Sequence, residues 1–153
     1  MDNEKTIAVN RRAHYRYAIH DTVEAGIALT GTEIKSIRAG RVNLAEAYAR
    51  IEKGEAWLIG AHIAPYTEGN RYNHEPTRTR KLLLHRDQIA ELAGRTSVKG
   101  ETMIPMRLYL KRGRAKLELG IGRGKKAHDK RAAIADRDAR RELERESRER
   151  IKL

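Results

Sequence analysis

Two adjacent stretches in which apolar and polar residues alternate constrain the fold more than any other feature of this sequence. Apolar residues occupy every second position from Met106 to Leu110, and again from Ala115 to Ile121. A period of two residues turns one side of a strand toward a core and the other toward solvent. Residues 112–114, Arg-Gly-Arg, separate the stretches with the length and composition of a tight connection. The sequence therefore predicts a β-hairpin here.

Shorter patterns of the same kind predict more strands. A second two-strand unit is expected across residues 48–63, with a turn at residues 53–55. In its second strand, the apolar residues at odd positions from Trp57 to Ile63 are expected to share one face. One or two further strands are expected between Tyr17 and Leu29, which gives five or six short strands in all.

Two segments with helical spacing interrupt these strands. Residues 32–38 carry isoleucines three positions apart, and Gly40 follows as a stop signal. Residues 85–93 place apolar side chains on one face, and Gly94 comes directly after them. Many short strands with two or three short helices favour a mainly β fold. We expect a small antiparallel β-barrel of the oligonucleotide-binding (OB) type, whose strand order the sequence does not reveal.

The balance of charge divides the chain. The net charge is +12, and a surplus of that size attracts polyanions, most commonly nucleic acid. Residues 123–153 hold 12 Lys and Arg against 7 Asp and Glu, with few large apolar side chains. We therefore expect an RNA-binding barrel domain at residues 1–122, with residues 1–7 flexible, and a basic C-terminal tail at residues 123–153.

Composition also argues against several classes of protein. Cysteine is absent, which excludes disulfides and thiolate metal sites and fits a cytoplasmic protein. No apolar run approaches the roughly 18 residues of a spanning helix, and the first residues do not resemble a signal peptide. The six His residues show no spacing typical of zinc sites or acid–base catalysis. We expect no enzyme, no metal, no cofactor and no membrane contact. A basic nuclease that uses His14 or His20 is the alternative.

The tail carries weak helical signals. Ala132, Ala135, Ala139 and Leu143 form a thin apolar stripe at helical spacing. Acid-before-base pairs add only about 0.2–0.5 kcal/mol each to a helix, whereas ordering the backbone costs about 1–2 kcal/mol per residue. We therefore expect the tail to be disordered when free and helical when a partner holds it. The alternative is a solvated appendage.

Two clusters combine cations with aromatic rings. One lies at residues 10–17 and the other at residues 71–81. Single-stranded or loop RNA is held in this way, with cations on phosphates and bases stacked on rings. The alternatives are a basic protein without a specific RNA target and, for Tyr48 and Tyr109, rings that close the barrel ends. The candidate RNA contacts in the two clusters are Arg11, Arg12, His14, Tyr17, Arg78, Arg80 and Lys81.

Several strings resemble the SsrA-binding protein family, also called SmpB. They are residues 10–13 (Asn-Arg-Arg-Ala), 24–27 (Glu-Ala-Gly-Ile), 31–40, 76–84 and 124–131. The match runs in order from about residue 7 to residue 131, and the ten-residue string at 31–40 is highly specific. The resemblance implies an OB-type barrel that binds the tRNA-like domain of transfer-messenger RNA (tmRNA, or SsrA RNA). It also implies delivery of that RNA to stalled ribosomes for trans-translation, with the protein in place of the anticodon arm.

The resemblance further implies roles for individual residues. Asn10, Tyr17 and Glu24 match positions implicated in binding the RNA, although an ion pair with a neighbouring Arg is an alternative role for Glu24. The resemblance places one stretch of the tail at the decoding centre of the small ribosomal subunit, with the rest of the tail in the empty mRNA channel. That stretch comprises Lys125, Lys126, His128, Asp129, Lys130 and Arg131.

The remaining partners follow from the same resemblance. Elongation factor Tu and alanyl-tRNA synthetase would meet the protein only through tmRNA, a contact with the large ribosomal subunit is left open, and we expect a monomer. The main alternative function is that of a general ribosome-associated or translation factor with an OB-type RNA-binding domain.

Overall fold

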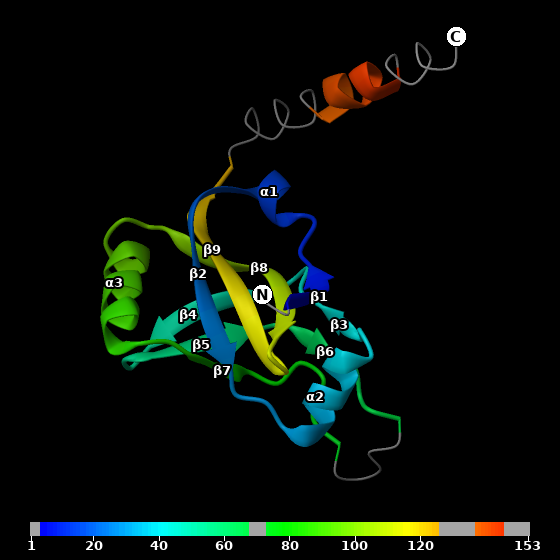
Figure 1. Cartoon of the computed structure of the whole chain (residues 1–153). Coiled ribbons are helices and arrows are strands. Elements are labelled where there is room, and N and C mark those ends of the chain that lie inside the picture. Colours follow the sequence, from blue (N-terminus) through cyan, green and yellow to red (C-terminus); the bar gives the residue numbers. More distant parts are fainter. Residues whose placement is uncertain (1–3, 68–72, 126–136, 146–153) are drawn as a thin grey trace.

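The computed structural model describes residues 4–67, 73–125 and 137–145 of the chain. Within this part, nine strands and three helices build one domain, and residues 137–145 form a further helical segment (Figure 1). The elements of the domain are β1 (Glu4–Val9), α1 (Ala13–Arg16), β2 (Tyr17–Ile27), α2 (Gly31–Arg38), β3 (Val42–Asn43), β4 (Tyr48–Glu52), β5 (Glu55–Ile59), β6 (His62–Ile63), β7 (Arg80–Leu83), α3 (Arg86–Ser97), β8 (Thr102–Lys111) and β9 (Arg114–Gly124).

The main sheet closes on itself. Six antiparallel strands pair in the order β8-β4-β5-β7-β2-β9, and β9 pairs in turn with β8. β1 adds to β8, while β3 and β6 form a separate two-stranded sheet. The helices lie around this closed sheet on different sides (Figure 1). The predicted mainly β, antiparallel fold with a few short helices is confirmed; the assignment to the OB type stays a prediction.

Both predicted hairpins are present, each with a two-residue turn. β8 and β9 pair from Lys111 opposite Arg114, so Arg112 and Gly113 form the turn with φ of 53° and 78°. β4 and β5 are joined in the same way by Lys53 and Gly54. Two successive positive φ values match the right-handed twist of the paired strands. The turns are therefore one residue shorter than the sequence suggested.

The prediction for the face of β5 is wrong. Ala56 and Leu58 are buried, whereas Trp57 is only half-buried. Beyond the strand the buried positions change to odd numbers, with Ala61 inside the core. Gly60 causes this change, because its φ of +80° breaks the alternation and its Cα lies against the backbone of Glu46. A Cβ at residue 60 would come within 2.9 Å of that carbonyl oxygen.

The helix predictions are largely confirmed. α2 begins after Thr30, whose side chain and that of Glu33 form a capping box. α3 does not end before Gly94 as predicted but continues to Ser97. Isolated glycine is tolerated inside a helix at a cost of about 1 kcal/mol, so Gly94 was a weak stop signal. The short helix α1 was not predicted.

The predicted domain limits need two corrections. Residues 4–7 belong to β1 and are not a flexible segment, because residues 4–6 pair with residues 109–111 of β8 and the pairing resumes at Ala8 after a register shift. At the other end β9 runs to Gly124, and the backbone N–H of Lys125 donates to the carbonyl of Arg16 at 2.8 Å. Hydrogen bonding to β2 and α1 therefore extends the folded domain beyond residue 122.

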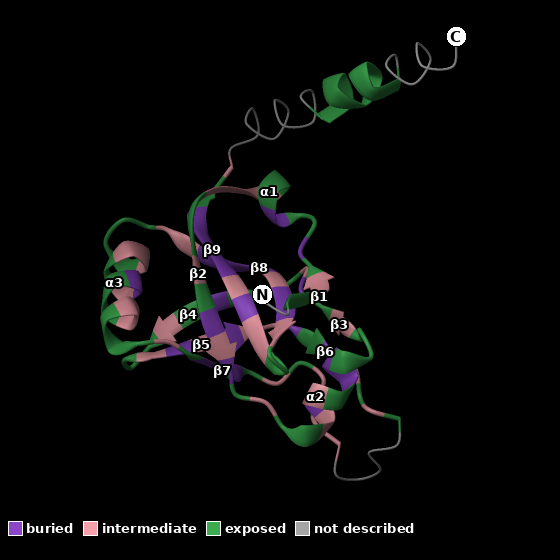
Figure 2. Cartoon of the chain, in the orientation of Figure 1, coloured by how far each residue is buried: buried purple, intermediate pink, exposed green. Residues whose placement is uncertain are grey.

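The apolar core lies inside the closed sheet. Its side chains come from both predicted hairpins, from β2 and β7, and from the helices α2 and α3, and include Leu58, Leu108, Leu117 and Leu119. Figure 2 shows the buried positions concentrated on the strands of the sheet. Residues 137–145 are exposed along their whole length, so they add nothing to this core.

Candidate nucleic-acid interface

The predicted RNA-binding residues fall into three groups in the structure. The first group lies around α1 and comprises Asn10, Arg11, Arg12, His14 and Tyr17. The second is a groove that contains Glu24 and Lys81. The third is the pair Arg78 and Arg80, which contact Glu33. The cluster at residues 71–81 is divided by the fold, because Lys81 lies in the groove and Arg78 and Arg80 contact Glu33.

Glu24 lies on β2 with its side chain 41% exposed. It accepts a hydrogen bond from the hydroxyl of Tyr109, and the ammonium of Lys111 lies 3.6 Å from the same carboxylate oxygen. The hydrogen bond from Tyr109 is the main reason that the pKa of Glu24 is lowered. Burial and this bond raise the pKa of Tyr109. Glu24 is therefore ionised and oriented, and its partners are not the Arg considered from sequence.

Beside Glu24 a groove of about 820 Å³ runs between the β4–β5 turn, β7 and the first turn of α3. Lys81, Arg86 and Lys116 place cations along it, while Leu83 is 53% exposed. Cations can bind phosphates, an exposed leucine can pack against a base, and a carboxylate can accept from base amino groups or a 2′-hydroxyl. This combination suits a nucleic acid better than a purely anionic ligand.

Leu83 and Lys116 were missed by the sequence analysis. Leu83 stands within a run of three leucines, which reads as buried in any element. Only the pairing of β7 shows that Leu82 points inward and Leu83 outward. Lys116 alternates with core residues on β9, so its outward direction could have been inferred, but not its position beside Glu24.

Around α1 the most buried of the predicted contacts is Asn10, at 5% exposure. Its side-chain amide donates to the carbonyls of Leu44 at 3.3 Å and Pro105 at 3.0 Å, and its backbone N–H donates to Met106. The side chain thus joins three segments of the fold, and its donors are used inside the protein. Arg12, in contrast, is exposed.

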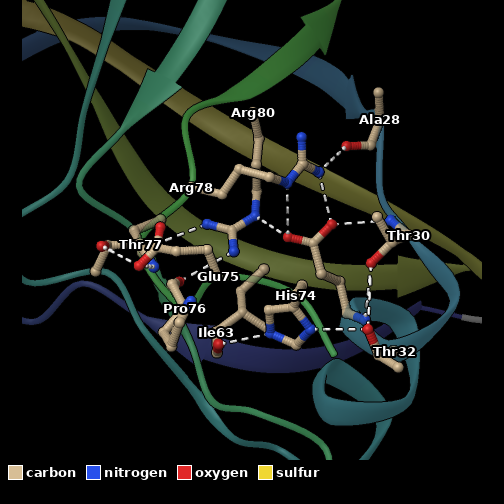
Figure 3. A network of polar contacts seen from close by, with 12 residues as sticks. Ala28, Thr30, Thr32, Ile63, His74, Glu75, Pro76, Thr77, Arg78 and Arg80 are labelled. Atoms are coloured by element: carbon tan, nitrogen blue, oxygen red, sulfur yellow. Dashed lines mark hydrogen bonds and ion pairs between the residues drawn. The ribbon is translucent and has the colours of Figure 1, made fainter. Parts of the chain in front are cut away.

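The third group is a buried ion network (Figure 3). Glu33 and Arg80 are both fully buried, and the Arg80 Nε donates to the carboxylate at 2.5 Å. The other two nitrogens of Arg80 donate to the carbonyls of Ala61 and Pro76. Arg78, which is partly exposed, donates to the second carboxylate oxygen at 2.6 Å. Arg80 therefore cannot contact RNA, and this prediction is wrong because Glu33 of α2 and the carbonyls of Ala61 and Pro76 enclose the guanidinium.

Glu33 is held ionised by its partners. Burial would raise the pKa of Glu33, but hydrogen bonds from Arg78, from the backbone N–H of Thr30 and from Arg80 lower it to about 2. His74 extends the network between α2 and β6, since its Nε2 must donate to the carbonyl of Ile63 at 2.8 Å. Its Nδ1 then accepts from the hydroxyl of Thr32 at 2.9 Å. The network fixes α2 against the chain that leads into β7.

Of the predicted tail contacts only Lys125 belongs to the described residues. Lys126, His128, Asp129, Lys130 and Arg131 lie outside them. Within residues 4–67, 73–125 and 137–145, no three His, Asp or Glu side chains gather as a metal site requires. The same part of the chain contains no helix with the length and apolar character needed to cross a bilayer.

Comparison with known proteins shows that the sequence is similar to those of one protein family. The family model described as SmpB protein matches residues 7–149. An SsrA-binding protein of Geobacillus sp. (strain WCH70) is 58% identical over 149 residues, which cover 97% of this chain and 96% of that protein. An SsrA-binding protein of Roseiflexus sp. (strain RS-1) is 57% identical over 152 residues, which cover 99% and 96%.

A solved structure is also similar. It is described as "tmRNA-SmpB: a journey to the center of the bacterial ribosome", and one of its chains is 50% identical to this one with a TM-score of 0.66. The match covers 78% of this chain and 85% of that chain. With a family model that spans most of the sequence and relatives that share more than half of their residues, this chain belongs to the SmpB protein family.

Proposed function

We propose that this chain binds the tRNA-like domain of tmRNA through its barrel domain and delivers that RNA to stalled bacterial ribosomes for trans-translation. The observation that carries the proposal is the 58% identity, over 97% of the chain, to a protein named SsrA-binding protein. The description of the similar solved structure, which names tmRNA and the bacterial ribosome, supports it further. The protein would act in the cytoplasm, where it reaches elongation factor Tu and alanyl-tRNA synthetase only through the RNA.

The groove at Glu24 supplies suitable chemistry for the first step. Its cations attract phosphates without regard to sequence, which gives affinity that falls with added salt. Glu24 and Leu83 can supply specificity for particular bases. An oriented carboxylate and an apolar side chain contact bases, which differ from one another, whereas cations contact phosphates, which are all alike. None of these contacts requires a chemical reaction, so the proposed role is binding and not catalysis.

The tail would supply the second step, on the ribosome. Its described segment, residues 137–145, is helical and exposed throughout. A helix without an apolar face against its own domain is stabilised mainly by what it packs against elsewhere. In the proposal that surface is RNA of the decoding centre and the empty mRNA channel, with residues 125–131 at the decoding centre.

The direct test is to sequence the RNA that copurifies with the tagged chain from bacterial cells. One dominant stable RNA with a tRNA-like domain is expected. Competition binding at fixed salt then separates this role from that of a general translation factor. The tRNA-like domain should compete far better than stem-loops of the same length, and equal competition would favour the general factor. Incubation of labelled RNA with the protein and Mg²⁺ should yield no cleavage; cleavage would favour the nuclease.

The two steps are separable by mutation. Replacing Asp129, Lys130 and Arg131 together by Ala should leave the Kd for tmRNA nearly unchanged and abolish tagging of stalled products in a translation extract. Equal loss of both activities would contradict the division of labour between barrel and tail.

A further inference from the structure

A second hollow lies at the α1 end of the barrel, away from the groove at Glu24. Its volume is about 160 Å³, several times the roughly 30 Å³ that one water occupies in the liquid. Tyr17 and Glu24 are seven positions apart on β2, which corresponds to about 20 Å along a strand. The two cavities are therefore separate sites. The side chains used below are Arg12, Arg16, Tyr17, Glu46 and Tyr48, all of which line the hollow.

The lining combines three kinds of chemistry. Tyr48 is 41% exposed and Tyr17 is half-buried, so two aromatic rings border the same small volume. Arg12 and Arg16 place two guanidinium groups beside them, and Glu46 adds a carboxylate. A ring offers a stacking face, a guanidinium binds a phosphate, and a carboxylate accepts hydrogen bonds from the N–H groups of a base.

The walls of the hollow are held in place before any ligand arrives. The Asn10 amide links the carbonyl of Leu44, next to the lining residue Ala45, to that of Pro105, next to the lining residue Ile104. The carbonyl of Asn10 also accepts from the N–H of Ala13 and so fixes the start of α1. Preorganised walls lower the entropy cost of binding.

Two charged side chains of the lining, in contrast, are held only weakly. The Arg16 Nη1 lies 3.9 Å from a carboxylate oxygen of Glu46, and 36% and 75% of the two side chains are exposed. An exposed ion pair of this kind contributes little to stability. Both side chains can therefore leave each other and contact a ligand, Arg16 at a phosphate and Glu46 at a base.

From these contacts we infer that the hollow at α1 binds one unstacked nucleobase of the RNA partner, with Tyr48 as its stacking face. A free phosphate fits less well, since Glu46 would repel it, and a purely apolar ligand would make no use of the two guanidinium groups or the carboxylate. The inference rests on the proposed function, because the RNA supplies the base. It gives Asn10 the part of a positioning residue that shapes the site, and it gives Tyr48 a binding role beyond closing the barrel end.

The test uses the full-length chain and RNA of the tRNA-like domain with 2-aminopurine at one unpaired position at a time. Binding of the wild type should quench the emission strongly at one position, because the base stacks there. Tyr48→Leu should abolish that quenching and raise the Kd about 5- to 150-fold, the range found for one stacked base. Tyr48→Phe keeps the ring and should stay within about 2-fold.

Tyr15→Leu is the matched control. Tyr15 is a similarly exposed tyrosine in the cluster at residues 10–17, which contributes Arg12 and Arg16 to the hollow, but Tyr15 itself does not line it. A Kd for Tyr48→Leu no higher than that for Tyr15→Leu would overturn the inference, and so would a wild type that quenches at no position. If Tyr48→Leu fails to fold, the inference can still be tested, because the quenching measurement on the wild type does not depend on any variant.

The outcomes also distinguish this inference from the proposed function. A wild type that prefers the tRNA-like domain, combined with an unaffected Tyr48→Leu, would reject the base pocket alone. A wild type without that preference would reject the proposed function and the base pocket with it.

Discussion

Two glutamates nine positions apart, Glu33 on α2 and Glu24 on β2, show two different uses of a carboxylate side chain. Glu33 is fully buried between Arg78 and Arg80, and its pKa is lowered to about 2. Glu24 is 41% exposed, bound by a tyrosine hydroxyl and a lysine, and it borders a groove. Desolvation makes the first carboxylate costly to disturb, whereas the second keeps lone pairs for a ligand. Burial, and not residue type, separates a group that maintains the fold from one that can bind.

The largest difference is expected in stability. Glu33→Ala leaves the guanidinium of Arg80 buried without its carboxylate and should lower the free energy of unfolding by about 3–5 kcal/mol. Urea unfolding followed by the fluorescence of Trp57 measures this loss. The control is Glu52→Ala, which removes an exposed ion pair with Arg50 and should cost at most about 1 kcal/mol. Similar losses in both variants would show that burial of Glu33 does not matter.

A pH series sharpens the same contrast. The pKa of Glu33 is about 2 in the folded chain, below its ordinary value of 4.5. Its ionised form therefore adds about 3 kcal/mol above pH 4.5, and this stability is lost as the pH falls from 4.5 toward 2. Urea midpoints at pH 7 and pH 2.5 should differ much less in Glu33→Gln than in the wild type. The pKa of Glu24 is lowered too, so Glu24→Gln should change the profile in the same direction but by less.

The third expected effect is on RNA affinity, for which Glu24 is expected to matter more than Glu33, the reverse of their effects on stability. Glu24→Ala should weaken binding of the tRNA-like domain by about 1.5–3 kcal/mol, the range for a hydrogen bond to a charged group. Its melting temperature should change far less than that of Glu33→Ala. Filter binding at two salt concentrations checks this, because loss of a specific contact leaves the salt slope unchanged. A gain in affinity that vanishes at high salt would contradict the specific contact, because removing a negative charge favours RNA binding by general electrostatics.

The sequence predicted the local parts of this arrangement and not the distant ones. The hairpin at residues 106–121 was predictable because its alternation and its turn lie within a short segment. The burial of Arg80 was not, since its carboxylate partner Glu33 is 47 positions away on α2 and meets it only in the folded domain. The same holds for Asn10, whose carbonyl partner at Pro105 is 95 positions away. The exposure of Leu83 in the groove could not be predicted either, because it follows from the pairing that turns its neighbour Leu82 toward the core.

Neither the family resemblance nor the local pattern indicated which of the candidate residues are exposed: Asn10, matched through the resemblance, is 5% exposed. Glu24, matched through a short string, is exposed beside cations and an apolar side chain. Arg80, chosen because a basic residue near aromatic residues suggests RNA, is fully buried. Charge density along a sequence therefore indicates a class of partner, but it does not indicate which cations face that partner.

The smallest effect concerns how Glu24 is held. Tyr109→Phe removes the hydroxyl that donates to Glu24 but keeps the ring, over which the Arg107 guanidinium lies at 4.0 Å. The carboxylate loses its fixed orientation, so RNA affinity should fall by about 0.5–1.5 kcal/mol while the fold is retained. Losing this donor also raises the pKa of Glu24 toward its ordinary value, so binding should be lost at a higher pH as the solution is acidified.

A double-mutant cycle decides whether Tyr109 acts through Glu24. If it does, the double variant with Glu24→Ala and Tyr109→Phe should bind RNA no more weakly than Glu24→Ala alone. Additive losses would instead mean that the Tyr109 hydroxyl contacts RNA or supports the groove independently. The pH profile separates those two cases from the proposed one, since only a lost hydrogen bond to Glu24 shifts the acid limb of binding. Tyr109 would then orient the exposed carboxylate of Glu24, as Arg78 and Arg80 orient the buried carboxylate of Glu33. Because the tyrosine hydroxyl is a neutral donor, the negative charge of Glu24 stays available to RNA.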